Sequence, residues 1–226
     1  KEGAKVVSLV DSLDESRLIY DHDVVDEHVW LSPYNAQIIC KEIEKAIVEF
    51  RPDYQVKLAD TLENYALELL ALEREYLALT EGFKLPTIIV ADRFPFAYLA
   101  KDCSLGYYAL FPTCSTDSEA SFDKIIEFAK IIDKTDAKYL VVTENFNKKL
   151  PDSIIENTKS KSCEMIIIDS MQSATEGDYI QISKNVLFKK LFVQCKCGKF
   201  LSFHPIPNLL PFFHVLSQFY SWYERS

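Results

Sequence analysis

Glycine is scarce in this chain, with five residues in 226. The sequence contains neither G-x-G-x-x-G nor G-x-x-x-x-G-K-S/T, so a glycine-rich loop that cradles phosphate is not expected. It also lacks the G-x-S-x-G turn of serine hydrolases and the H-E-x-x-H helix of zinc peptidases. With four histidines in all, a Ser-His-Asp device has few places to form. These absences argue against nucleotide binding and the commonest hydrolase chemistries.

Excess positive charge and long apolar runs are missing too. The net charge is −9 and the pI is about 5.0, so nucleic acid is not an expected partner. No stretch approaches the run of about 18 apolar residues that a transmembrane helix needs. Residues 1–5 lead directly into the strand-like run Val6–Val10, without the pattern of a signal peptide. The protein is therefore either cytoplasmic or begins upstream of residue 1.

The cysteines form no disulfide framework. Four of the six are isolated in apolar surroundings, where we expect small buried side chains: Cys40, Cys103, Cys114 and Cys163. Cys195 and Cys197 are separated by one residue, and no second pair completes a zinc site, so this signal is weak.

Two helices are expected in the first third of the chain. Ser32 and Pro33 suit the N-cap and first turn of a helix, and apolar residues then recur at helical spacing until Pro52. From Asp53 to Thr80 apolar residues alternate in steps of four and three, which predicts one long helix of about 40 Å. A short coiled coil and a rigid rod between two lobes both fit this stripe, and its three heptads favour the rod.

The second half alternates between strands and helices. Expected strands are Leu85–Ala91, Tyr107–Phe111, Tyr139–Thr143 and Met165–Ile168; expected helices are Phe96–Cys103, one capped by Ser118 or Ser121, Pro151–Thr158 and Tyr179–Leu191. Continuous apolar strands separated by helices predict an α/β fold, with a parallel sheet covered by helices on both faces. We expect the remnant of a second α/β lobe at 1–51, a linker helix at 52–83, the α/β lobe at 84–190, and an aromatic tail of no assigned role at 191–226.

Carboxylates follow three of the expected strands. Asp92, Glu144 and Asp169 each stand just after a strand, and ligands bind at this edge of an open parallel sheet. Such oxygens can hold a divalent cation, although an acid after a strand is more often the N-cap of the next helix. His28 stands just before a helix, where a lone histidine is more often structural than a metal ligand.

Several segments, in order, resemble the zinc- and manganese-binding receptors of bacterial ABC importers. The segment from Asp26 to Pro33 resembles that family's D-P-H-x-W-L-x-P motif. Five later segments over roughly residues 5–190 are similar to its H-D-A-F, E-x-S/T, V-x-x-E, D-P/S-L and Y…N motifs: Asp92–Phe96, Ser118–Ser121, Val142–Asn145, Ile168–Met171, and Tyr179 with Asn185.

The resemblance implies a two-lobed receptor joined by one long helix, with Zn²⁺ or alternatively Mn²⁺ held between the lobes. His28 would be the second ligand of the N-lobe and Asp169 the second of the C-lobe. The acidic stretch around His22 would correspond to the histidine- and acid-rich loop of zinc members. The implied partner is the membrane subunit of an ABC importer, and the implied location is extracytoplasmic, with membrane association only through a lipid anchor that this chain lacks.

Two departures accompany the resemblance. The family's first lobe, with its first histidine ligand, would precede residue 1. The ligand expected after the first C-lobe strand aligns with Ala91, so either the adjacent Asp92 or water takes its place. With two or three ligands where zinc favours four, we expect this chain by itself to bind metal weakly or not at all.

Three hypotheses follow. The first is a metal receptor, here incomplete, that is not an enzyme. The second is a metal-assisted hydrolase using Asp92, Glu144 and Asp169, for which a nucleophile and a general base are missing. The third is a non-functional remnant.

Overall fold

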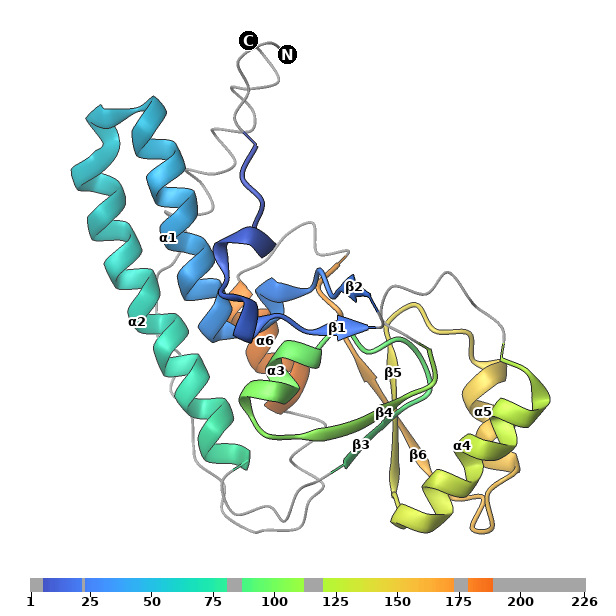
Figure 1. The fold of residues 1–226 in the computed structure, drawn as a ribbon. Helices are drawn as coiled ribbons and strands as arrows, with labels where there is room; N and C mark the ends of the chain where they lie inside the picture. The colour runs from blue at the N-terminus through green and yellow to red at the C-terminus, as the bar shows by residue number, and fades with distance from the viewer. Residues whose placement is uncertain (1–5, 22, 81–86, 112–119, 173–178, 189–226) are drawn as a thin grey trace.

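The computed structural model describes residues 6–21, 23–80, 87–111, 120–172 and 179–188 (Figure 1). In these residues a helical hairpin stands beside an α/β unit, and the short N-terminal elements lie between them (Figure 1). The helices are α1 (Pro33–Phe50), α2 (Gln55–Thr80), α3 (Ala97–Asp102), α4 (Phe122–Thr135), α5 (Lys149–Glu156) and α6 (Tyr179–Phe188). The 3₁₀ turns are η1 (Val10–Ser12), η2 (Glu15–Arg17), η3 (Val29–Leu31) and η4 (Pro52–Tyr54).

The expected parallel sheet is confirmed. It consists of β3 (Thr87–Val90), β4 (Gly106–Ala109), β5 (Tyr139–Thr143) and β6 (Glu164–Ile168), in the order β4-β3-β5-β6. Every neighbouring pair runs parallel, so the carboxyl ends of all four strands lie at one edge. That edge is where the sequence places its strand-end carboxylates.

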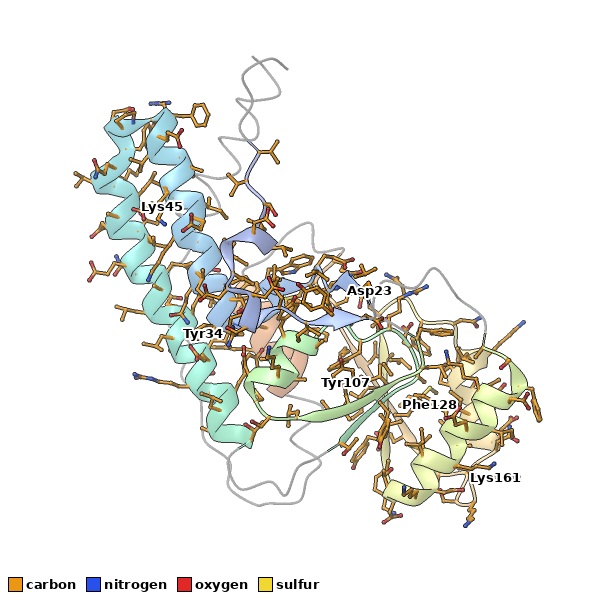
Figure 2. The ribbon with its side chains drawn as sticks, viewed as in Figure 1. Asp23, Tyr34, Lys45, Tyr107, Phe128 and Lys161 are labelled. Carbon is orange, nitrogen blue, oxygen red and sulfur yellow. The ribbon has the colours of Figure 1, made fainter. Side chains whose placement is uncertain are left out.

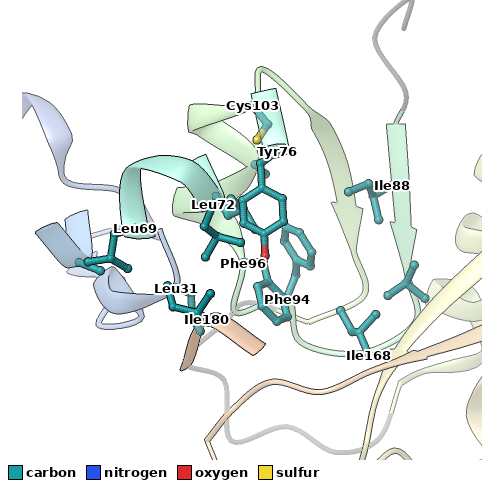
Figure 3. Packing of buried hydrophobic residues seen from close by; sticks show 14 of the residues in the cluster. Leu31, Leu69, Leu72, Tyr76, Ile88, Phe94, Phe96, Cys103, Ile168 and Ile180 are labelled. Atoms are coloured by element: carbon teal, nitrogen blue, oxygen red, sulfur yellow. The ribbon is translucent and has the colours of Figure 1, made fainter. Parts of the chain in front are cut away.

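Helices cover both faces of the sheet, as expected. Along β3 and β5 alternate residues point to opposite faces, which is the two-residue period of a strand. One face packs on α2, α3 and α6 through a cluster that includes Ile88, Val90, Val141, Leu72, Tyr76, Leu99 and Ile180 (Figure 3). The other face packs on α4 and α5 through a cluster that includes Ile89, Leu140, Val142, Phe128 (labelled in Figure 2), Ile132 and Ile154.

The predicted start and end of α1 are confirmed. The Ser32 hydroxyl accepts a hydrogen bond from the Asn35 backbone N–H at 3.1 Å, and proline occupies the first turn. The helix ends at Phe50, because Pro52 cannot donate the next hydrogen bond.

The long helix predicted from Asp53 to Thr80 is confirmed as α2, which runs back along α1 (Figure 1). Its apolar stripe is buried at Leu58, Leu62, Tyr65, Leu69, Leu72 and Tyr76. Near its end the Tyr76 hydroxyl donates to the Ser183 carbonyl of α6 at 2.8 Å. One end of α2 therefore packs on α1, and its other end packs on the α/β unit. The expected division into a lobe remnant (1–51), a linker helix (52–83) and an α/β lobe (84–190) stays a prediction.

The strand predicted at Val6–Val10 is wrong. Val6 is 89% exposed, and Val10 opens the 3₁₀ turn η1. Apolar β-branched residues form a strand only where a neighbouring strand accepts them, and within the described ranges no strand lies beside this segment. A short hairpin of β1 (Tyr20–Asp21) and β2 (Val24–Val25), which the sequence did not indicate, occurs in the acidic loop instead.

Cys40, Cys103 and Cys163 are buried free thiols, as predicted. Cys114, Cys195 and Cys197 lie outside the described residues, as does the aromatic tail at 191–226. In the part of the chain that the structure describes, no helix has both the length and the apolar character to cross a membrane.

Candidate metal-binding site

His28 is buried at the junction between the hairpin β1–β2 and the turn η3. Only 3% of the surface of His28 is exposed. The imidazole lies 5.4 Å from the Trp30 ring, centroid to centroid, and the Trp30 carbonyl accepts a hydrogen bond from the Tyr179 hydroxyl at 2.7 Å. The turn that carries His28 is thereby attached to α6 of the α/β unit.

Asp26 orients this imidazole. Its Oδ1 accepts hydrogen bonds from the His28 backbone N–H at 2.8 Å and from the ring Nδ1 at 2.9 Å. The Asp26 backbone carbonyl in turn accepts from the Tyr98 hydroxyl of α3 at 2.7 Å. A carboxylate can only accept, so Nδ1 carries a proton, and in the neutral imidazole Nε2 is then the acceptor. Carboxylate–histidine pairs of this kind prepare a neutral imidazole for a metal ion.

The His28 Nε2 atom meets the turn that follows β6. It is hydrogen-bonded to the side-chain amide nitrogen of Gln172, which is three residues beyond Asp169. This contact joins positions 144 residues apart and brings the turn of the expected C-lobe ligand against the histidine of the expected N-lobe ligand.

Asp169 opens that turn and is exposed. Its Oδ1 accepts a hydrogen bond from the Met171 backbone N–H at 2.8 Å, which is a local turn interaction and leaves the side chain in water. Asp169 is therefore an exposed carboxylate in the turn whose Gln172 side chain reaches the oriented imidazole. Metal ligation by His28 and Asp169 stays a prediction.

The other two strand-end carboxylates connect strands to one another. Asp92 Oδ2 accepts from the backbone N–H of Thr143 at 3.3 Å and from its hydroxyl. Glu144 accepts from the Ser170 backbone N–H at 2.8 Å and from its hydroxyl at 2.7 Å. We expected such acids more often to cap the next helix, but neither Asp92 nor Glu144 does so. They hold the ends of β3, β5 and β6 together.

The position that aligns with a ligand in the resembling family carries no ligand atom. Ala91 is buried, and its backbone N–H donates to the Val141 carbonyl at 2.9 Å. Asp92 beside it already bonds Thr143 and, through Oδ1, the Arg93 backbone N–H at 2.8 Å. Its expected role as replacement ligand stays a prediction.

Sequence reasoning missed two members of this site, Asp26 and Gln172. Asp26 stands two residues before His28, and that spacing is the local signal for an aspartate that orients a histidine. Among the described residues, the ligand atoms of Asp26, Glu27 and His28 lie within 4.8 Å of one another. Gln172 has no such signal, because only the folded chain brings it to His28.

The fold is shared with the periplasmic zinc binding protein TroA from Treponema pallidum, with a TM-score of 0.69 and 17% identity, covering 81% of this chain and 70% of that one. The family model described as zinc-uptake complex component A, periplasmic (ZnuA) matches residues 1–188. The chain belongs to this family, a family of metal-binding transport receptors, and the resemblance seen in its motifs is confirmed.

Two curated relatives of this chain are also zinc-binding proteins. The zinc-binding lipoprotein AdcA of Streptococcus pneumoniae serotype 4 is 26% identical over 157 residues, which is 70% of this chain and 30% of that protein. The zinc-binding protein AdcA of Streptococcus pyogenes serotype M6 is 24% identical over 153 residues, which is 68% of this chain and 29% of that protein. The chain thus spans about three tenths of the curated relatives it matches.

Proposed function

We propose that this chain is part of an extracytoplasmic receptor that binds Zn²⁺ and delivers it to the membrane subunit of an ABC importer. The observation that carries the proposal is the His28 imidazole, which Asp26 holds with Nε2 facing the turn of Asp169. The names of the relatives support zinc, an extracytoplasmic location and a lipid anchor.

The proposed ligands are His28 and Asp169. Zinc accepts imidazole nitrogen and carboxylate oxygen together, whereas a site dominated by oxygen would suit Mn²⁺, the alternative ion. Asp92 is the weaker candidate for a third ligand, because both its oxygens already accept hydrogen bonds from the protein.

The proposal also holds that the protein is not an enzyme. A hydrolase built on strand-end acids would need them available to a water molecule or a substrate. In the structure Asp92 and Glu144 bond the hydroxyl groups of Thr143 and Ser170, which favours a binding protein.

The test is a zinc titration of the 226-residue chain, followed by long-range ¹H–¹⁵N spectra of its histidine rings. We expect the Nε2 resonance of His28 to shift, with a dissociation constant weaker than about 1 μM. His28→Ala should abolish the binding, and His22→Ala, in the same acidic loop, should preserve it.

Zinc binding that is unchanged in His28→Ala would refute the proposed site. Because His28 is buried, each variant is first checked by thermal unfolding. His28→Asn, which keeps a side-chain N–H donor but offers no ring nitrogen, replaces the alanine variant if the latter does not fold.

A further inference from the structure

The turn from Asp169 to Gln172 is held in an unusual conformation. Met171 has φ = 59°, a left-handed backbone that a long side chain seldom adopts. The Asp169 carboxylate accepts from the Met171 backbone, and the Ser183 hydroxyl lies 3.7 Å from the Met171 sulfur. Strained backbone of this kind persists where the surroundings over-determine it, and it is concentrated at functional sites.

The preceding residue, Ser170, is fixed equally well. Both its backbone N–H and its hydroxyl donate to Glu144. The Ser170 hydroxyl oxygen also lies 3.4 Å from the Gln172 backbone nitrogen, which donates to it. These contacts present the side chain of Gln172 to the buried His28, although Gln172 itself is exposed.

The amide of Gln172 can meet His28 in two ways. With Nδ1 of His28 protonated toward Asp26, Nε2 accepts, so the amide nitrogen of Gln172 faces it as a donor. The terminal torsion of glutamine is broad and roughly two-fold, so a half-turn would put the amide oxygen there instead. Two facing lone pairs repel each other unless a cation lies between them.

We propose that Gln172 is a switchable ligand, whose amide nitrogen holds His28 Nε2 in the metal-free protein and whose amide oxygen binds the divalent cation once it arrives. This inference rests on the proposed function and deepens it by naming a third ligand. His28, Asp169 and Gln172 then supply one nitrogen and two oxygens. Zinc favours four ligands, and an amide oxygen is an accepted donor to divalent cations.

The experiment compares Gln172→Ala and Gln172→Glu with the parent chain, using Gln55→Ala as the matched control. Gln55 is an exposed glutamine at the start of α2, remote in sequence from the site. Zinc affinity is measured by competition with a chelator, and the visible absorption of bound Co²⁺ reports the ligand set.

We expect Gln172→Ala to weaken zinc binding about ten-fold and to change the Co²⁺ spectrum, because one ligand is lost. Gln172→Glu should strengthen zinc binding about ten-fold, since it places a charged oxygen at the same point. Gln55→Ala should leave both measurements unchanged. Thermal unfolding of Gln55→Ala should match that of the parent chain, whereas the Gln172 variants should unfold at a somewhat lower temperature, because they lose the hydrogen bond to the buried His28 Nε2.

Zinc binding in Gln172→Ala that is unchanged, or tighter, would overturn the proposal, and tighter binding would show that the amide only competes with the ion. The same holds if Gln172→Glu does not strengthen binding. These outcomes are separable from failure of the proposed function. If His28→Ala abolishes zinc binding while Gln172→Ala has no effect, only the ligand role of Gln172 fails; if His28→Ala has no effect, the site itself fails.

Discussion

Aspartates in two regions of this molecule have opposite environments. At the seam between the N-terminal segment and α3, Asp26 is buried and Asp102 nearly so. At the carboxyl edge of the sheet, Asp169 is exposed and makes one local turn contact. The carboxylate of each seam aspartate accepts two hydrogen bonds from the protein, whereas Asp169 keeps most of its carboxylate in water. Asp92, at the same sheet edge, already accepts from Arg93 and Thr143. The seam therefore fixes geometry, and Asp169 is the aspartate at the edge that is available to a ligand.

Asp102 connects three segments of the seam. Its Oδ1 accepts from the Arg17 guanidinium at 2.8 Å, and its Oδ2 accepts from the Ser32 hydroxyl. Arg17 also donates twice to Asn35 Oδ1, at 3.0 and 2.7 Å. Through these bonds the N-terminal segment and α1 are fixed to α3, and the His28 turn lies between them in the sequence.

The largest effect on stability should come from Asp102→Ala. Removal of one partner from a largely buried ion pair leaves the other charge uncompensated, which costs about 3 kcal/mol of unfolding free energy, the low end for buried pairs. Urea unfolding measures the loss. Lys138→Ala is the control, because both members of its ion pair with Asp136 are exposed, and we expect a change within about 0.5 kcal/mol there. Equal losses in the two variants would contradict the comparison.

Asp26→Asn should come next. The shape is kept, but a charged acceptor of two hydrogen bonds from His28 becomes neutral, which should cost about 1–3 kcal/mol of unfolding free energy. Because the imidazole loses its orienting carboxylate, zinc affinity should fall about 10- to 100-fold. Urea unfolding and chelator competition measure the two losses. A variant that loses stability and keeps its zinc affinity would show that Asp26 supports the fold alone.

The local elements of this fold could be predicted because their causes are local. The cap at Ser32, the stop at Pro52 and the strand Tyr139–Thr143 each follow from neighbouring residues, and all are confirmed. The strand predicted at Val6–Val10 is wrong for the opposite reason, since a strand needs a partner that sequence spacing does not reveal.

The site was predictable only in part. The resemblance marked His28 and Asp169, but chemistry alone favoured a structural histidine and helix-capping acids. Gln172 reaches His28 across 144 residues, and Arg17 reaches Asp102 across 85. Contacts at such separations depend on how the elements pack, so no motif near either residue could indicate them.

A pH-dependent effect, which grows with each pH unit, should appear in the seam under alkaline conditions. Desolvation by burial, and then the adjacent Asp102, raise the pKa of the Cys103 thiol from 9.0 to about 12. Above pH 9 the unfolded chain loses this proton and the folded chain keeps it, so stability falls as pH rises toward 12, by up to about 1.4 kcal/mol per pH unit. Below pH 9 the thiol is neutral in both states and contributes no pH dependence.

Urea unfolding between pH 8 and pH 11 tests this, with Cys103→Ala for comparison. The unfolding free energy of Cys103→Ala should fall less steeply with pH than that of the parent chain, whatever the stability of the variant at pH 8. Equal slopes would show that the thiol ionises as readily in the folded chain as in the unfolded one. The seam would then be more accessible to water than its geometry indicates.

The smallest effect on stability should come from Asp169→Asn. The side chain is exposed, and an asparagine oxygen can still accept from the Met171 backbone, so unfolding free energy should change by less than about 0.5 kcal/mol. Zinc binding should nevertheless weaken strongly, because a neutral amide replaces a charged ligand. Urea unfolding and zinc competition on the same preparation separate the two effects. A variant with unaltered zinc affinity would remove Asp169 from the site, and one as unstable as Asp102→Ala would erase the distinction between edge and seam.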